Sequence, residues 1–165
     1  MGHDGDTEPA RELPRRAAAG LVAGLLVTLV ATSCSPEDSG PTKRIEKSAQ
    51  TDLAPLRART VGLPEDATCL WFSGTLGDGA PGPSTYWIDA SVSTTDEAVE
   101  EFRALCPDTA PSDPVVVAEL AEELGEDEFA ECPAAAESIA AEGWQTRAWI
   151  SRTSPTLVIT LVGQG

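Results

Sequence analysis

The fold is decided by two stretches, Cys69-Leu70-Trp71-Phe72-Ser73-Gly74-Thr75-Leu76 and Ser84-Thr85-Tyr86-Trp87-Ile88-Asp89-Ala90-Ser91-Val92-Ser93. Between them lies a turn-forming segment, Gly77-Asp78-Gly79-Ala80-Pro81-Gly82-Pro83. Both stretches alternate apolar with small or polar residues, which is the period of a half-buried strand. We therefore predict a β-hairpin with a long loop.

A helix is predicted directly after the hairpin. Thr94-Thr95-Asp96-Glu97 is a candidate capping box, in which the Thr94 hydroxyl accepts a hydrogen bond from an amide near Glu97. The apolar stripe that follows consists of Ala98, Val99, Phe102, Leu105 and Cys106. Pro107 lies just beyond the stripe, as expected for a helix that stops there.

Two more helices are predicted further along the chain. The first begins with Asp113 as N-cap and Pro114 in the first turn, although the run Val115-Val116-Val117 can instead begin as a strand. The second, weaker pattern spans residues 133–142. Each pattern is followed by a glycine, Gly125 and Gly143 respectively.

Two strand-like runs, Trp144 to Arg152 and Thr156 to Val162, complete the chain. The order is strand, strand, two or three helices, strand, strand. It favours an α+β fold in which an antiparallel sheet of about four strands carries its helices on one face. We expect one small acidic domain over residues 61–165, preceded at 34–60 by a flexible tether rich in Ser, Pro, Thr and charged residues.

Strict alternation predicts a tryptophan-rich face on this sheet. If Leu70, Phe72 and Ile88 face the helices, five residues point the other way: Trp71, Trp87, Asp89, Arg147 and Trp149. Such a face is a candidate binding surface for a peptide strand, a sugar ring or a partner protein. The alternative is structural, with the tether, a terminus or a second copy of the chain covering the rings.

The N-terminal region has the order of a secretory signal. Arg11, Arg15 and Arg16 precede an uncharged apolar run, and Ala31-Thr32-Ser33 leads into Cys34. This arrangement resembles a bacterial membrane lipoprotein precursor. The resemblance implies a signal peptide over residues 1–33, cleavage before Cys34 and a diacylglyceryl group on its sulfur. It also implies a location on the extracytoplasmic side of the cell membrane, with the lipid on Cys34 as the membrane contact.

Two alternatives to the lipoprotein interpretation stay open. The apolar run approaches the ~20 residues that span a bilayer as a helix, so an uncleaved anchor is one. Ordinary secretion is the other.

Removal of residues 1–33 would leave the protein without histidine, because His3 is the only one. Serine or cysteine nucleophiles that need imidazole as a base are then excluded, as are zinc sites with histidine ligands. We predict no catalytic residue and no cofactor. The seven carboxylates between Glu119 and Glu131 lack the spacing of an EF-hand loop, so no metal site is predicted either.

The net charge is strongly negative. Of 27 acidic and 11 basic residues, four acids and three arginines precede Cys34, which leaves 23 and 8. Five of those eight cations lie between Lys43 and Arg59, and only Arg103, Arg147 and Arg152 follow. Such a chain repels phosphate backbones, so nucleic acid is not an expected partner.

Three cysteines remain if Cys34 carries lipid, which suggests one disulfide and one free thiol in an oxidising location. A bridge between Cys106 and Cys132 would close a loop of about 26 residues and contribute about 3 kcal/mol in the chain-entropy model. Pairing of Cys69 with either of them is equally open from the sequence.

These features favour a lipid-anchored binding or interaction module of the cell envelope with an unidentified ligand. One competing class is a small hydrolase that uses carboxylates. The other is an inhibitor that engages another exported protein through the acidic surface.

Overall fold

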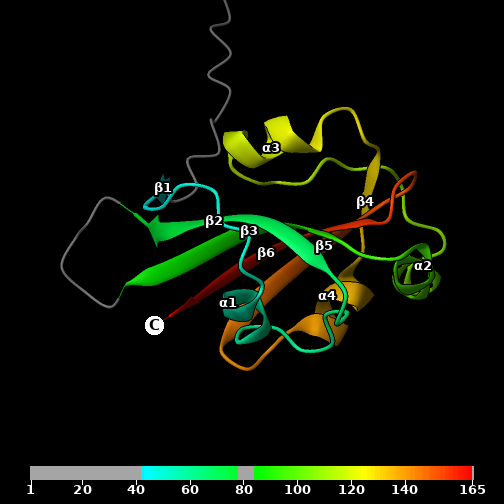
Figure 1. Ribbon diagram of the computed structural model, residues 1–165, viewed down its shortest axis with the longest axis horizontal. Helices are drawn as coiled ribbons and strands as arrows, with labels where there is room; N and C mark the ends of the chain where they lie inside the picture. Colours follow the sequence, from blue (N-terminus) through cyan, green and yellow to red (C-terminus); the bar gives the residue numbers. More distant parts are fainter. Residues whose placement is uncertain (1–41, 78–83, 165) are drawn as a thin grey trace, which may run out of the picture. The chain divides into compact units, whose positions relative to one another are not determined.

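The computed structural model describes residues 42–77 and 84–164, which form an α+β fold with one six-stranded antiparallel sheet and four helices (Figure 1). The strands are β1 (Lys43–Ile45), β2 (Thr68–Leu76), β3 (Thr85–Ser93), β4 (Phe129–Glu131), β5 (Trp144–Ser151) and β6 (Thr156–Gln164). The helices are α1 (Ala54–Arg57), α2 (Asp96–Leu105), α3 (Ala118–Leu124) and α4 (Pro133–Ile139). The predicted signal peptide, Cys34 and the hairpin-loop residues 78–83 lie outside the described residues.

The predicted hairpin is confirmed. β2 and β3 pair along their whole length, from Thr68 opposite Ser93 to Leu76 opposite Thr85. β3 then pairs with β6 over nine positions, so the sheet order is β1-β2-β3-β6-β5-β4. The three longest strands therefore lie side by side at its centre.

The sheet has six strands where about four were expected. The two additional strands are short: β1 pairs with β2 at the Gly74 end, and β4 pairs with β5 at the Ser151 end. β1 needs Gly74 opposite it, because a Cβ atom there would lie 1.7 Å from the Arg44 carbonyl oxygen.

The predicted boundary between tether and domain at residue 60 is wrong. Residues 42–60 contain β1 and α1, and Leu56 of α1 is fully buried in the main core. Between these elements, Gln50 exchanges two backbone hydrogen bonds with Trp71. Few apolar residues occur in this segment, but they are placed where the core accepts them, which composition alone does not reveal.

The helices cover both faces of the sheet, whereas one face was predicted (Figure 1). On the first face, α1, α2 and α4 enclose the main core with residues of β2, β3, β5 and β6. On the second face, Val117 and Leu120 pack against Phe72 and Trp87. The second core exists because α3 crosses to the side opposite the other helices.

Two predicted helix starts are also corrected. The N-cap of α2 is Thr95 and not Thr94, and its hydroxyl accepts from the Ala98 amide at 3.3 Å. The third helical position is therefore Ala98, so no capping box forms. α3 begins at Ala118 and not at Pro114, because its N-cap, the β-branched Val117, has an extended backbone.

Cys106 and Cys132 form a disulfide that joins the end of α2 to the start of α4, which confirms that candidate pairing. Cys69 is a buried free cysteine. Burial raises the pKa of its thiol, as does the nearby charge of Asp52, while Arg57 acts in the opposite direction. Cys69 is thus a weakly reactive member of the core.

None of the helices in the described ranges 42–77 and 84–164 combines the length and apolar character needed to cross a membrane.

Candidate functional site

The predicted tryptophan face divides between the two sides of the sheet. Trp71 lies opposite Ala90 and belongs to the main core, while Phe72 lies opposite Asp89. Trp71 therefore faces α1 and α4, and the prediction that it shares a face with Trp87 is wrong. The sheet is covered on both faces, and β2 accordingly has apolar side chains on both sides. The sequence pattern of β2 therefore did not indicate which face of the sheet Trp71 occupies.

The other four residues of that prediction lie on the second face. Trp87 and Trp149 are at most 1% exposed, so this face is a packed interior. The Trp87 indole donates to the Thr75 carbonyl oxygen at 3.0 Å. The chain between Val116 and Leu124 covers this face. Two residues of the predicted tether also lie against it, Ile45 in the same cluster and Lys43 over the Trp87 ring, so the structural alternative in which the tether covers the rings is confirmed in part.

Asp89 is fully buried on β3 and holds two other segments. Both carboxylate oxygens accept from the Lys43 ammonium, at 2.6 and 2.7 Å, and one also accepts from the Val117 amide at 2.8 Å. Burial raises the pKa of Asp89, and the attraction of Lys43 and the Val117 hydrogen bond offset this only in part. The Lys43 ammonium also lies 5.3 Å from the centre of the Trp87 ring.

Arg147 covers the outer end of the second face. Its guanidinium lies 4.6 Å from the centre of the Trp149 ring and donates to Glu131 at 2.8 Å. Arg147 is exposed, so this pair is a surface ion pair of small energetic value.

A groove of about 540 Å³ opens on the first face, beside α1. Its lining combines four aromatic residues with charged, small and apolar ones: Glu46, Lys47, Pro55, Arg59, Trp71, Ser73, Gly74, Tyr86, Trp87, Ile88 and Trp144. The volume lies in the range of small-molecule sites, which is about 300–1,000 Å³. This groove is our candidate functional site.

The aromatic rings of the groove are placed by strand register. Tyr86 of β3, Gly163 of β6 and Trp144 of β5 occupy one row across the sheet. A Cβ atom on Gly163 would lie 2.8 Å from the Trp144 ring, so the ring rests against this glycine. Tyr86 is 39% exposed, Trp144 is half-buried and Trp71 is almost buried.

Two cations line the groove. The Arg59 guanidinium lies 5.4 Å from the centre of the Trp144 ring and donates once to the Pro55 carbonyl oxygen. Within residues 42–77 and 84–164, neither Arg59 nor Lys47 forms an ion pair. The one acid, Glu46, accepts from the Thr75 hydroxyl at 2.8 Å. The groove lining therefore has two cations and one acid, and no carboxylate among the described residues forms an ion pair with either cation.

The sequence contained only part of the signal for this groove. Trp71 was among the candidate binding residues, but its neighbours there, Tyr86 and Trp144, come from strands distant in sequence. Arg59 and Lys47 were assigned to the tether. The excess of cations between Lys43 and Arg59 was visible, and it is the feature that could have directed attention to this segment.

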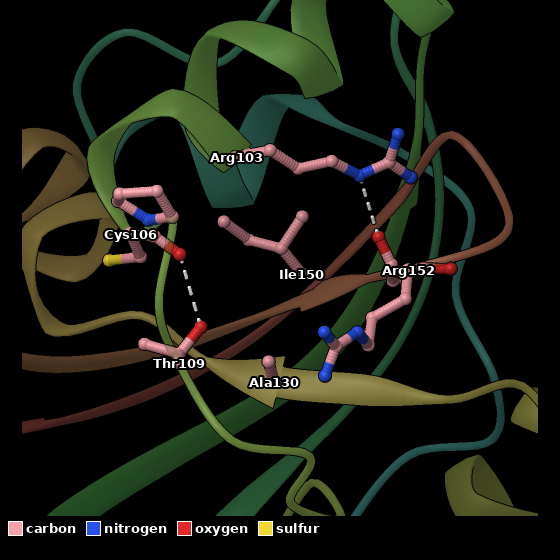
Figure 2. A pocket seen from close by; sticks show the side chains of 8 residues that line it. Arg103, Cys106, Thr109, Ala130, Ile150 and Arg152 are labelled. Atoms are coloured by element: carbon pink, nitrogen blue, oxygen red, sulfur yellow. Dashed lines mark hydrogen bonds between the residues drawn. The ribbon is translucent and has the colours of Figure 1, made fainter.

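A smaller cavity of about 200 Å³ lies beside the disulfide (Figure 2). The Arg103 guanidinium at its margin donates to the Ser151 and Ser154 carbonyl oxygens and pairs with Glu100. The Thr109 hydroxyl donates to the Cys106 carbonyl oxygen. These groups fasten α2 and the following loop to the sheet, and the cavity is below the usual size of a ligand site.

The acidic segment has a structural contact with the β5–β6 turn. Asp127 accepts hydrogen bonds from Thr153 and Ser154. Burial raises the pKa of Asp127, but hydrogen bonds from Ser154, Thr153, Ser151 and the Glu128 amide outweigh it, and the net pKa is lowered. In the part of the chain that the structure describes, no three acidic or cysteine side chains gather as a metal site would require.

The geometry defines a class: an antiparallel α+β domain with a core on each face of its sheet and an aromatic groove lined by two cations that form no ion pair with the described residues. Comparison of the chain with protein-family models, with curated proteins and with solved structures found no match.

Proposed function

We propose that this protein is a lipid-anchored, extracytoplasmic binding module whose ligand site is the aromatic groove. The observation that carries the proposal is the pair of cations, Arg59 and Lys47, held beside Tyr86 and Trp144 without a protein counter-ion in the described residues. Rings and fixed charges at the edge of a concave site are features of ligand recognition.

The distribution of carboxylates gives less support to the hydrolase alternative. The acid with a raised pKa, Asp89, lies on the opposite face and is enclosed by Lys43 and Val117. Glu46, the one acid in the groove, is exposed and already accepts from Thr75. A glycosidase needs two carboxyl groups that flank its substrate, and the groove lining contains one.

Membrane attachment through Cys34 is part of the proposal. Nine residues after Cys34 the chain enters β1, so a lipid on this cysteine would hold the domain within about 30 Å of the bilayer, given a reach of ~3.3–3.6 Å per residue. The acidic charge after residue 60 would keep most of the surface off anionic headgroups.

The attachment is tested by mass spectrometry and membrane fractionation of the native product. We expect a mature chain that begins with a lipid-modified Cys34 and sediments with membranes, and a Cys34→Ser variant that does not. An intact N-terminus or an unmodified Cys34 thiol would contradict the anchor.

Ligand binding is tested by ligand-detected NMR with a panel of saccharides and short peptides. Trp144→Ala should abolish any signal that the unaltered protein gives, because the ring forms one side of the groove. Val115→Ala, at a residue that is 62% exposed and not part of the groove lining, is the control and should leave the signal unchanged. Binding that is unaffected by Trp144→Ala would place the site elsewhere.

A further inference from the structure

We infer that the groove binds an acidic saccharide, that is, a sugar ring carrying a carboxylate or a phosphate. This inference rests on the proposed binding function and specifies the ligand's chemistry. Three properties of the groove support this inference: its accessible aromatic rings, its two cations without an ion-pair partner in the described residues, and its strand edge, whose backbone groups are already hydrogen-bonded.

The accessible rings suit a ligand with an apolar face and a polar rim. Tyr86 and Trp144 lie in one row with Gly163 between them, and the Trp144 ring rests against this glycine. The lining also contains polar side chains, among them Ser73, Glu46 and Lys47. A wholly apolar ligand would desolvate these groups without replacing their hydrogen bonds, which is costly. A sugar ring covers the aromatic faces with its C–H groups and meets the polar groups with its hydroxyls.

The charge pattern indicates an anionic substituent. Lys43 is bound to Asp89, and Arg57 donates to the Pro64 and Glu65 carbonyl oxygens. Lys47 and Arg59 are the members of this cationic segment that line the groove. Arg59 is held over Trp144 and uses one of its guanidinium nitrogens on Pro55, which leaves donors for a carboxylate or phosphate. On a molecule with nineteen carboxylates after residue 60, this is a local site of opposite sign.

The backbone around the groove disfavours a peptide strand as the ligand. At Ser73 and Gly74 the outer edge of β2 is already taken by β1, with the Glu46 amide donating to the Ser73 carbonyl oxygen. Further along, Gln50 occupies the same edge beside Trp71. An extended peptide would find no free ladder of backbone groups there, and such a ladder is the main source of affinity in strand addition.

The test is calorimetric titration of the full-length protein with four probes: a glucuronic acid disaccharide, its neutral glucose counterpart, glucose 6-phosphate and an acidic tripeptide. We expect an acidic sugar to bind at least about tenfold more tightly than the neutral one, since a charge-assisted pair is worth more than 1.4 kcal/mol. Arg59→Gln should remove this preference. Trp144→Phe should lower the affinity for every sugar probe. Arg152→Gln removes an arginine outside the groove lining and should change nothing.

Other results would overturn the inference in distinguishable ways. Equal affinity for neutral and acidic sugars, together with no change of affinity in Arg59→Gln, would refute the acidic ligand. Binding of a sugar in the groove would remain supported. Preference for the tripeptide would replace the saccharide with a peptide in the same site. Failure of all four probes with correctly folded protein would count against both the ligand class and the proposed function. Near-ultraviolet circular dichroism of each variant establishes its folding.

Discussion

At the scale of single residues, Asp89 has the most demanding position in the molecule. It lies at the centre of the sheet, and three segments meet at its carboxylate: β3, β1 through Lys43 and the extended chain at Val117. Its pKa is raised even though the ammonium is within 2.7 Å, because the loss of hydration outweighs the attraction. The Lys43–Asp89 ion pair therefore holds β1 in position, and its net contribution to the free energy of unfolding is small.

We predict that Lys43→Met destabilises the protein by about 3–5 kcal/mol at pH 7, since it leaves a buried carboxylate without a cation. Urea unfolding followed by tryptophan fluorescence gives the free energy. The double variant Lys43→Met with Asp89→Asn removes the orphaned charge and should recover part of the loss.

The effect of pH on this variant follows from the direction of the Asp89 shift. A carboxyl group whose pKa is raised by folding binds its proton more tightly in the native state. Its contribution to stability is thus fully present below the unfolded pKa of about 3.8 and is lost as the pH rises through the folded pKa. The deficit of Lys43→Met relative to the unaltered protein should shrink as the pH falls. A deficit that is the same at pH 7 and at pH 4.5 would contradict this account.

Asp127 responds to pH with the opposite sign. Its net pKa is lowered in the folded protein, so its contribution is present above the unfolded pKa and is lost as the pH falls through the folded value. Comparison of variants at each pH cancels this shared term, which is why the difference between Lys43→Met and the unaltered protein is the quantity to measure.

At the scale of elements, the start of α2 shows how little separates two candidate caps. Thr94 and Thr95 are neighbours, and both precede acidic residues that favour a helix N-terminus. Thr95 is the N-cap, while the Thr94 hydroxyl makes a long, exposed contact of 3.4 Å with Asp66. The Thr94 amide is bound to the Pro155 carbonyl oxygen, which places Thr94 in the turn before the helix.

We predict that Thr95→Ala lowers the free energy of unfolding by about 1 kcal/mol, the usual cost of a lost N-cap. Thr94→Ala is the matched control and should change it by less than about 0.5 kcal/mol. Chemical denaturation of the two variants side by side decides the matter. If Thr94→Ala lowered the free energy of unfolding more than Thr95→Ala does, the result would support the capping box predicted from the sequence.

α3 begins four residues later than the sequence pattern predicted, at Ala118 where Pro114 was expected. Val115 to Val117 interrupt a pattern that otherwise begins with Asp113 and Pro114, and Val117, directly before the helix, is extended. The extended conformation lets the Val117 amide reach Asp89 on the sheet. A helix over the same residues would have directed that amide along its own axis.

At the scale of the whole molecule, the segment predicted as a tether completes the fold. Leu56 of α1 is fully buried, and Thr60 and Val61 bond to the chain at the end of α4. The same segment supplies Arg59 and Lys47 to the groove. Stability and the candidate site therefore depend together on residues 43–60.

We predict that Leu56→Ala costs about 2–5 kcal/mol, as expected for a cavity in a packed core. Val61→Ala, at a side chain that is 51% exposed, should cost less than about 0.5 kcal/mol. Thermal and urea unfolding of both variants provide the measurement. If Leu56→Ala unfolds like the unaltered protein, the segment is a tether after all.

The sequence by itself determined the local pattern: the β2–β3 hairpin, the apolar stripe of α2, the strands β5 and β6, and Cys106–Cys132 as one of three candidate disulfides. These depend on periodicity and spacing, which neighbouring residues determine. Only the tertiary structure decided which face Trp71 occupies, where α3 lies and how Tyr86, Trp144 and Arg59 meet. The physical reason is that β2 is apolar on both sides, so either orientation buries similar surface. Pairing with β3 and the covering of both faces then select one orientation, and those contacts join residues far apart in the chain.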